Sequence, residues 1–380
     1  MSSNLSTSSA PLLKRWLEPM VDPSVFDFWA SHVNPTWSWS RPLARIVSRR
    51  IEALDTVTLV LRPNRHVGTY LPGQHVNVSA EVRGRKVTRS YSLTSLPSQD
   101  TISITIKRVE GGVLSTHLVQ HAQVGEVLEI GPAFGDMTLP AQPSGRWLFL
   151  AAGSGITPLM GLTRALAARH MPVELTLIYW AKTRAELCFV RELQALKARE
   201  PRFRFVPVLT HEPEVLAHEH RGLINQMQLD HLVPAWPEHQ VYACGPGGFV
   251  EAARQWVQPR ALRFVAEGFT PTAPVSASMP ASMSASTSAL PDTDARTVHV
   301  HLARTGRTLA VSTGTSLLEA LEAQGLNPRS GCRMGICHTC VCTRHSGSTL
   351  DTQRGDITSE ADMPVRLCVS RASSDLSLDL

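Results

Sequence analysis

The sequence predicts a multidomain protein with an antiparallel β-barrel, an α/β domain built on a parallel sheet, and a small α+β domain, in that order. Three observations predict this architecture. Short alternating apolar runs, separated by turn residues, fill the segment 41–141. Apolar strands alternate with helical stretches over 145–268. A segment poor in charges, 269–296, then separates both blocks from a cysteine-rich end at 297–380.

Length and composition are those of an ordinary globular chain. The 380 residues allow two or three domains, and 43% hydrophobic with 18% charged residues is typical of a soluble protein. No apolar run approaches the roughly 20 residues that a membrane span needs. The Ser-rich start, 1–11, is followed by no apolar run suited to a secretion signal, so we expect a cytoplasmic protein. A net charge of +5 without a long basic block argues against a nucleic-acid partner.

The first block consists of runs that alternate apolar and polar residues, as half-buried strands do. The runs are PLARIVS, TVTLVLRP, HVNVSAEV, VTRSYSLTS and TISITIKRV, and the turn signals LPG, VRGR and EGG separate them. Ahead of this block lies an N-terminal extension, 1–40, in which SVFDFWASHV has the pattern of a short amphipathic helix. We therefore predict a barrel preceded by one helix.

The second block pairs short apolar strands with helical stretches. The pairs are RWLFLAAG with PLMGLTRALAARH, VELTLIYW with ELQALKARE, and QVYACG with GGFVEAARQWV. Such alternation predicts a parallel sheet wrapped by helices. Because dinucleotides bind at the carboxyl ends of such strands, the residues after each strand are the candidates for a nucleotide site.

Residues 271–296 are nearly all Ala, Ser, Thr, Pro and Met, and they show neither helical nor strand periodicity. We predict a flexible linker over 269–296, with a reach of roughly 25–30 Å that would let a small domain move between two docking positions. Beyond it, VHVHLART and TLAVSTG predict a hairpin, SLLEALEAQG predicts a helix, and a cysteine loop follows.

Five of the seven cysteines lie close together in this last segment. Four have the spacing C-x4-C-x2-C followed by one distant cysteine, which is the pattern of plant-type [2Fe–2S] clusters: Cys332, Cys337, Cys340 and Cys368. Zinc sites favour paired C-x2-C knuckles, so zinc is the weaker hypothesis, and disulfides are rare in the cytosol. Cys342 lies outside the pattern, and we interpret it as a small buried hydrophobe.

Two segments of the barrel contain short motifs. The first has the pattern RxYS: Arg89, Ser90, Tyr91 and Ser92. The second is a GG…S segment: Gly111, Gly112, Val113, Ser115 and Thr116. They resemble the flavin signature and the flavin-pyrophosphate segment of the ferredoxin–NADP reductase superfamily. The resemblance implies FAD rather than FMN, with the arginine on a phosphate, the tyrosine ring on the isoalloxazine and a hydroxyl at its reactive edge. Taken alone, RSYS would also suit an ordinary barrel strand.

Two turns of the α/β block resemble the nicotinamide-binding motifs of the same superfamily. One, AAGSGITP, follows the first strand and supplies these candidates: Gly153, Gly155, Thr157 and Pro158. The other resembles the CGP motif that closes over the nicotinamide: Cys244, Gly245, Pro246 and Gly248. A tight strand-to-helix turn needs glycine for structure alone, and Cys244 would also suit a packed core position. The pairing of both turns therefore carries the prediction.

Lys182 and Arg184 follow the second strand of this block, where an acidic residue would bind the ribose hydroxyls of NADH and a basic one the 2′-phosphate of NADPH. They favour NADPH, although both would also suit a solvated surface. The resemblance implies hydride transfer from NAD(P)H to the flavin, with Ser92, Thr157 and Cys244 as the catalytic residues. Single electrons would then pass to the cluster of a β-grasp ferredoxin domain.

The order of flavin, nicotinamide and ferredoxin parts resembles reductases that serve oxygenases, hydroxylases and fatty-acid desaturases. The segment VNPTWS resembles reductases of membrane desaturases, so we predict a desaturase as the electron acceptor and peripheral membrane contact through 1–40. The aromatic residues of this extension would dock there or brace the reductase: Phe26, Phe28, Trp29, Trp37 and Trp39. The alternatives are a soluble ring-hydroxylating oxygenase or monooxygenase as acceptor, and a non-catalytic redox sensor.

Overall fold

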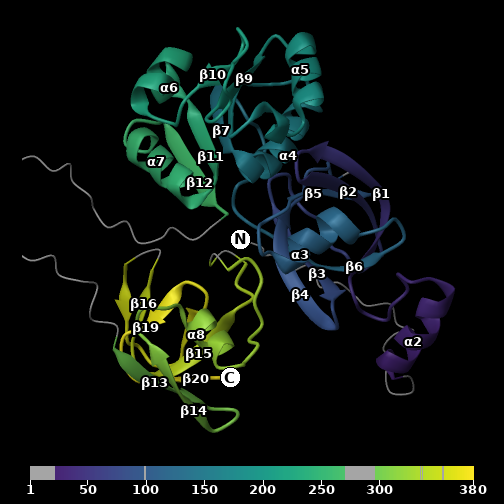
Figure 1. Ribbon diagram of the computed structural model, residues 1–380, viewed down its shortest axis with the longest axis vertical. Helices are drawn as coiled ribbons and strands as arrows, with labels where there is room; N and C mark the ends of the chain where they lie inside the picture. The colour runs from purple at the N-terminus through teal and green to yellow at the C-terminus, as the bar shows by residue number, and fades with distance from the viewer. Residues whose placement is uncertain (1–21, 98–99, 270–295, 334, 336, 353–354) are drawn as a thin grey trace, which may run out of the picture.

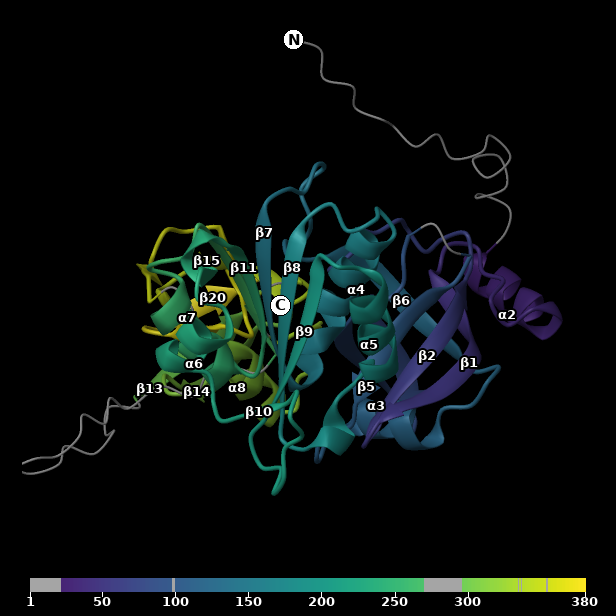
Figure 2. The ribbon, with the colours of Figure 1, turned by 90° about the horizontal axis from the view of Figure 1, so that it is seen from above.

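The computed structural model describes residues 22–97, 100–269, 296–333, 335, 337–352 and 355–380. Nearly all of the predicted linker and the start of the N-terminal extension lie outside these residues. Figures 1 and 2 show three folded parts, a barrel, an α/β domain and a C-terminal domain, with helix α2 on the side of the barrel away from the C-terminal domain.

Helix α2, Pro23–Val33, forms where the extension was predicted to be helical. The Asp22 carboxylate caps it by accepting from Ser24 N at 2.8 Å. Asp27 ties the helix to the chain that follows, because its carboxylate accepts from Trp39 N at 2.6 Å. The Phe26 and Trp39 rings pack edge to face at 5.4 Å. One face of α2 is therefore fixed to the segment that enters the barrel.

The barrel is a six-stranded antiparallel sheet in the order β4-β3-β6-β1-β2-β5. Each predicted run forms a strand, and its alternate apolar residues fill one core, with Ile46, Leu59 and Ile104 fully buried. A short helical stretch, α3 and η1, covers the core between β5 and β6 in the chain. The strands and helices are β1 Leu43–Ala53, β2 Thr56–Pro63, β3 His75–Val82, β4 Arg85–Ser92, β5 Ile102–Lys107, α3 Val113–Thr116, η1 His117–His121 and β6 Val127–Phe134.

The α/β domain is a six-stranded parallel sheet in the order β10-β9-β8-β7-β11-β12. Helices cover both faces, so each face has its own apolar core, around Trp147 on one side and Trp236 on the other. The strands are β7 Arg146–Ala152, β8 Glu174–Ala181, β9 Phe203–Leu209, β10 His220–Arg221, β11 Gln240–Gly245 and β12 Arg263–Gly268. The helices are η2 Gly153–Gly155, α4 Ile156–Ala167, η3 Arg184–Glu186, α5 Val190–Arg199, α6 Gln226–Leu232, η4 Trp236–Glu238 and α7 Gly247–Val257.

The C-terminal domain packs helix α8 on a mixed five-stranded sheet in the order β14-β13-β20-β15-β18, beside a small three-stranded sheet. Strands β13 and β14 form the predicted hairpin, and β20 pairs with β13 in parallel. The elements are β13 Thr297–Leu302, β14 Arg307–Ser312, α8 Leu317–Ala323, β15 Val341–Ser346, β16 Thr349–Asp351, β17 Ile357–Thr358, β18 Met363–Arg366, β19 Ser370–Ala372 and β20 Leu376–Leu378. The predicted fold class, a multidomain chain with these three architectures, is confirmed.

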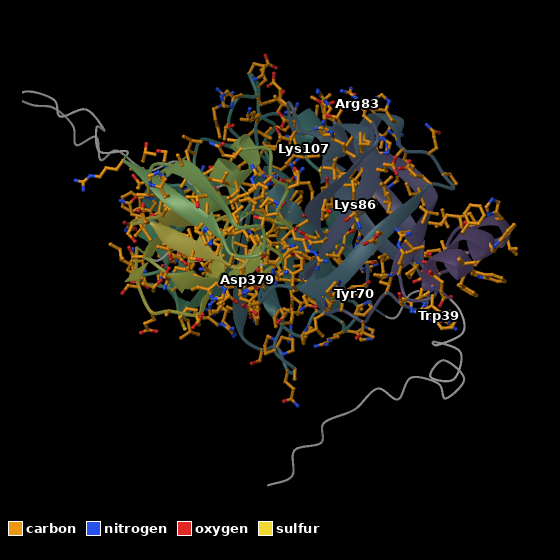
Figure 3. The ribbon with its side chains drawn as sticks, turned by 90° about the horizontal axis from the view of Figure 1, so that it is seen from below. Trp39, Tyr70, Arg83, Lys86, Lys107 and Asp379 are labelled. Atoms are coloured by element: carbon orange, nitrogen blue, oxygen red, sulfur yellow. The ribbon has the colours of Figure 1, made fainter. Side chains whose placement is uncertain are left out.

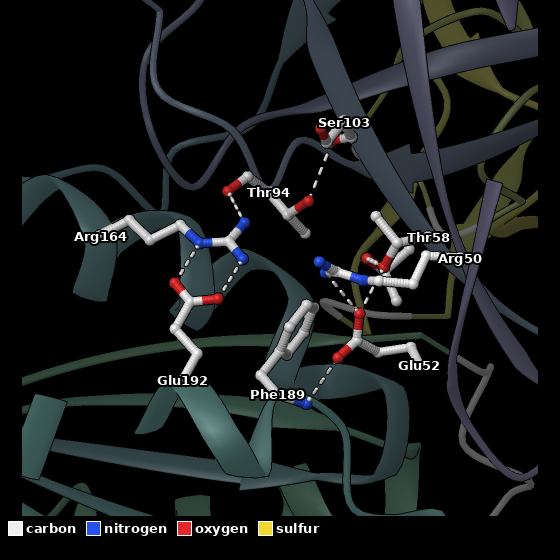
Figure 4. A network of polar contacts seen from close by, with 9 residues as sticks. Arg50, Glu52, Thr58, Thr94, Ser103, Arg164, Phe189 and Glu192 are labelled. Atoms are coloured by element: carbon white, nitrogen blue, oxygen red, sulfur yellow. Dashed lines mark hydrogen bonds and ion pairs between the residues drawn. The ribbon is translucent and has the colours of Figure 1, made fainter. Parts of the chain in front are cut away.

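The barrel and the α/β domain form a continuous interface. Arg164 on α4 donates to the Thr94 carbonyl at 2.6 Å while pairing with Glu192, and the Glu52 carboxylate accepts from the backbone of Phe189 at 3.1 Å (Figure 4). A cavity of about 490 Å³ lies along this boundary. No helix among the described residues is long and apolar enough to cross a membrane.

Candidate active site and cluster site

The carboxyl end of β4 meets the start of α4. Thr157 Oγ1, in the first turn of α4, donates to Ser92 Oγ at 3.0 Å and lies 2.9 Å from the Ser154 carbonyl. Both hydroxyl side chains are buried. Two of the three predicted catalytic residues, one from each domain, are thus in direct contact.

A second contact across the same boundary extends this pair. His75 Nδ1 lies 2.9 Å from Ser92 Oγ, and its Nε2 lies 2.5 Å from a carboxylate oxygen of Glu267 at the end of β12. Only 2% of His75 is exposed. The result is a chain of polar groups, Thr157, Ser92, His75 and Glu267, that begins in the barrel–α/β boundary and ends on a carboxylate.

Cys244, the third predicted catalytic residue, is fully buried at the end of β11, opposite Glu267 on β12. Burial, with the nearby Glu267 charge, raises the pKa of the Cys244 thiol well above its usual value. The thiol is therefore neutral at physiological pH. The Cys244 backbone lies directly against Gly155, two residues before Thr157.

The two nucleotide turns interlock through glycines. A Cβ at Gly155 would lie 2.0 Å from the Cys244 carbonyl oxygen, and one at Gly245 would lie 2.9 Å from Ala152 Cβ. Gly153 has φ +54°, which glycine adopts without strain. No larger side chain fits at Gly155 or Gly245 unless the turns separate.

The position of these turns in the sheet is the one at which dinucleotides bind. The chain builds the sheet outward from β7 to β8, β9 and β10, and then returns to place β11 on the other side of β7. The strand order therefore reverses between β7 and β11, and ligands of open α/β sheets bind in the crevice at such a switch point. Pro158 lies in the first turn of α4 there, and Pro246 and Gly248 lie at the start of α7.

The flavin motif lies on the edge strand β4. Arg89 donates to the carbonyl of the preceding residue, and its pKa is lowered by partial burial and by the nearby Arg333 guanidinium. Two neighbouring guanidinium groups repel each other, and a bound phosphate anion would relieve that repulsion by pairing with them. Burial raises the pKa of Tyr91, so its ring is a neutral stacking surface. Ser90 donates to Asn77 Oδ1 at 2.6 Å, so its hydroxyl is already engaged by β3.

The GG…S segment forms a tight turn into α3. Gly111 has φ +71°, and a Cβ at Gly112 would lie 2.5 Å from Ser115 Oγ. That hydroxyl accepts from Val109 N at 3.2 Å, so Ser115 closes the turn instead of facing outward. The predicted pyrophosphate contacts, including those of Val113 and Thr116 within α3, stay predictions.

The four cysteines of the predicted cluster site form two pairs. In one, Cys332 N lies 3.2 Å from Cys337 Sγ, and Cys337 N lies 3.3 Å from Cys332 Sγ. In the other, the sulfurs of Cys340 and Cys368 are 3.2 Å apart, and Gly335 N donates to Cys368 Sγ at 3.3 Å. Backbone N–H groups thus already point at the sulfurs, as they do at thiolates.

This donor set fits two irons better than one zinc ion. Each iron of a [2Fe–2S] cluster takes two cysteine sulfurs, whereas structural zinc takes four ligands. Within the described ranges, no group of three or more His, Cys, Asp or Glu residues is placed to hold a single ion. Hydrogen bonding to Cys332 lowers the pKa of the Cys337 thiol to about 4, and bonding to Cys368 lowers that of Cys340 to about 7, while the same contact raises the pKa of Cys368. Thiolates are the form that binds iron.

Comparisons with known proteins agree with this geometry. Three family models match: the oxidoreductase FAD-binding domain over 44–138, the oxidoreductase NAD-binding domain over 149–255, and the 2Fe-2S iron-sulfur cluster binding domain over 300–373. An NADPH oxidoreductase of Mycobacterium tuberculosis is 33% identical over 97% of this chain and 92% of its own length. The chain belongs to the ferredoxin reductase-type flavoproteins that carry a C-terminal [2Fe–2S] domain.

Other relatives of the reductase extend the same pattern. The glycine betaine monooxygenase reductase subunit of Pseudomonas aeruginosa is 29% identical over 92% of this chain and 99% of its own length. Phthalate dioxygenase reductase shares the fold, with a TM-score of 0.54 at 22% identity over 89% of this chain and 97% of that chain. FAD, a [2Fe–2S] cluster and NAD(P)H are the cofactors of the reductase, and the prediction of an NAD(P)H-dependent oxidoreductase is confirmed.

Two residues of the polar chain that runs from Thr157 to Glu267 were not predicted from the sequence. His75 directly follows the turn LPGQ, and Glu267 lies at the carboxyl end of the last parallel strand. The position of Glu267 at a carboxyl strand end was a usable signal, because such ends form the nucleotide crevice. His75 gave none, since it occupies a polar position of the alternating run HVNVSAEV, where a solvated side chain is expected.

The predicted NADPH residues lie in different surroundings. The Arg184 guanidinium is held by the Glu219 carboxylate through two bonds of 2.7 Å, and Glu212 lies 3.4 Å from it. Lys182 is exposed at the end of β8. Arg184 is therefore already neutralised, and Lys182 is the predicted cation that faces solvent.

Proposed function

We propose that this reductase supplies electrons to an oxygenase or monooxygenase, taking hydride from NAD(P)H and delivering single electrons through its [2Fe–2S] domain. The proposal rests on the contacts that strand β4 makes with two other parts of the molecule. Its last residue, Ser92, meets the nucleotide domain through Thr157, and Ser90, two residues earlier, meets the cluster loop through Asn77. One strand therefore contacts both the nucleotide domain and the cluster loop.

Bound flavin supplies the conversion between two-electron hydride chemistry and one-electron transfer. The chain orients the reacting groups around it. His75, held by Glu267, fixes the Ser92 hydroxyl, and Thr157 holds it from the other side. Because these groups are buried, bulk water does not compete for their hydrogen bonds.

Relatives named as reductase subunits of monooxygenases support an oxygenase acceptor over the desaturase that the N-terminal segment VNPTWS predicts. A membrane desaturase stays the second candidate because of one observation. Phe28 is 57% and Trp29 67% exposed on α2, while Phe26 packs against Trp39. One face thus braces the reductase and the other offers aromatic rings to a partner or to a membrane surface.

An anaerobic spectrum tests the core of the proposal. Addition of NADH or NADPH to purified protein should bleach both the flavin bands and the broad cluster absorbance. Bleaching of neither would reject the function. Bleaching of the flavin bands alone would reject the cluster as the exit for electrons.

A second experiment identifies the class of acceptor. The double variant Phe28→Ser/Trp29→Ser, compared with wild type, should keep cytochrome c reduction because α2 is remote from the cluster domain. Loss of binding to anionic vesicles would support the membrane desaturase. Unchanged vesicle binding with weakened turnover of a soluble oxygenase would support the proposed acceptor.

A further inference from the structure

The cluster loop meets the barrel at one polar side chain. Asn77 lies on β3 directly opposite Ser90 on β4. Its Oδ1 accepts from Ser90 Oγ at 2.6 Å, and its Nδ2 donates to Thr339 Oγ1 at 2.9 Å. Since an amide has one accepting and one donating end, the bond from Ser90 leaves the Asn77 amino group turned towards Thr339.

Two glycines pack around this amide. A Cβ at Gly331, in the cluster loop, would lie 2.7 Å from Asn77 Oδ1 and 2.9 Å from Cys337 Sγ. A Cβ at Gly131, on β6, would lie 3.3 Å from Asn77 Cβ. The Asn77 side chain is therefore held within a space that fits it closely, and the cluster loop approaches it as near as a backbone without a side chain allows.

We propose that Asn77 is a positioning residue that docks the cluster loop on the flavin strand and so sets the rate of electron transfer within the chain. This rests on the proposed function. Ser90, Asn77 and Thr339, here called the latch, connect the strand of the flavin motif to the cluster loop, since Thr339 directly precedes Cys340. Each transfer moves one electron from reduced flavin to oxidised cluster and breaks no bond. The latch therefore acts on the position of the two domains and not on the chemistry.

The latch is weak enough for the C-terminal domain to dissociate from the barrel after it has received an electron. Between residues that the structure describes, one hydrogen bond crosses from the barrel to the C-terminal domain, from Asn77 to Thr339. A single bond between neutral groups stabilises a contact only modestly. The docked state is thus preferred for receiving an electron from the flavin, and thermal motion suffices to free the cluster for an external acceptor.

Substitution Asn77→Ala tests the proposal in the full-length, cofactor-loaded protein. We expect NAD(P)H-driven ferricyanide reduction, which needs only the flavin, to stay unchanged. Stopped-flow reduction of the cluster by the flavin should slow about 10-fold, the upper end of what one neutral hydrogen bond contributes. The matched control is Ser79→Ala, which removes a 2.6 Å bond to Thr88 between the same two strands but touches no residue of the cluster loop.

A pair of substitutions on the other side of the latch provides an independent test. Thr339→Val removes the accepting hydroxyl at nearly constant volume and should slow cluster reduction as Asn77→Ala does, whereas Thr339→Ser should restore the rate. Wild-type rates in both Asn77→Ala and Thr339→Val would overturn the proposal. If Asn77→Ala does not fold, the Thr339 pair decides.

Small-angle scattering adds a readout that does not depend on turnover. Asn77→Ala should enlarge the radius of gyration relative to wild type and Ser79→Ala, because the C-terminal domain spends more time undocked. An unchanged radius contradicts the latch. If NAD(P)H reduces neither the flavin nor the cluster in the wild-type chain, the proposed function is wrong. The scattering measurement then tests the latch by itself.

Discussion

The reductase has two internal interfaces of opposite character. The barrel meets the α/β domain through many contacts: Ser92 with Thr157, His75 with Glu267, Thr94 with Arg164, Lys107 with Glu186, Leu54 with Ala185, and Glu52 with Phe189. The barrel meets the C-terminal domain, over the residues described, through a single hydrogen bond from Asn77 to Thr339, the packing of Gly331 on Asn77, and the approach of Arg333 to Arg89. Figure 3 labels Lys107 of the barrel, which belongs to the first interface, and Asp379 of the C-terminal domain.

The difference follows from what crosses each boundary. Hydride transfer requires reacting atoms about 3–3.5 Å apart, and a small misplacement is costly, so that interface must be rigid. An electron needs no bond between donor and acceptor domains, and the same cluster must later reach a partner. A thin interface, on a domain that the predicted linker would keep at high effective concentration, meets both needs.

The largest expected effect comes from removing the electron exit. Cys368→Ser takes one sulfur from the Cys340–Cys368 pair, and a hydroxyl is a poor iron ligand. We expect complete loss of cluster absorbance and of cytochrome c reduction, with ferricyanide reduction retained because the flavin side is untouched. Cys342→Ser is the control. Cytochrome c reduction that survives Cys368→Ser would mean that electrons leave from the flavin.

The rigid interface should fail sharply when its spacing changes. A Cβ at Gly161, on α4, would lie 2.8 Å from the Leu93 carbonyl oxygen in the barrel. Gly161→Ala favours the helix intrinsically, so any loss must come from separation of the domains. We expect flavin reduction by NAD(P)H to slow about 100-fold, as a displacement near 1 Å can cause.

The control for this prediction is Gly68→Ala, since a Cβ at Gly68 meets nothing within 4 Å. The rate from reduced flavin to the cluster should not change in either variant, because the hydrogen bonds of the latch run between β4, β3 and the cluster loop and not to α4. Equal slowing of both steps in Gly161→Ala would show that the two interfaces are not independent.

The fold was largely predictable because its signals are local. Every predicted barrel run and every predicted strand–helix pair has its element in the structure. The small sheet of β16, β17 and β19 was not predicted, since strands of two or three residues are too short to show a period. The cluster cysteines were predictable for the same reason as the strands, because three of the four lie in one loop.

Contacts between domains were not predictable, because they join positions far apart in the chain. His75 and Glu267 are separated by 192 residues, and Asn77 and Thr339 by 262. Within its own strand Asn77 is one of several polar residues in the alternating run HVNVSAEV, and nothing local distinguishes it from a solvated residue. The predicted catalytic role of Ser92, Thr157 and Cys244 also stays a prediction, although the first two are in direct contact.

Glu267→Gln should weaken the rigid interface without changing its shape. The amide keeps the size of the side chain but loses the charge that bonds to His75 Nε2 at 2.5 Å. Because hydrogen bonds to charged groups contribute more than neutral ones, we expect flavin reduction to slow about 10-fold. An unchanged kcat for ferricyanide reduction would show that His75 holds Ser92 without help from the carboxylate.

The smallest expected effect concerns the choice of nicotinamide. The Arg184 guanidinium lowers the pKa of Glu219 by hydrogen bonding, so Glu219 is ionised at neutral pH and keeps Arg184 occupied. Glu219→Gln should release the guanidinium towards a 2′-phosphate and shift the ratio of kcat/KM for NADPH over NADH upward by about fivefold, the scale of a partly exposed ion pair. Lys182→Ala should lower the same ratio. Glu219→Gln could leave the ratio unchanged while Lys182→Ala lowers it. In that case Lys182 alone binds the 2′-phosphate, and the Arg184–Glu219 ion pair serves only to hold the loop after β9.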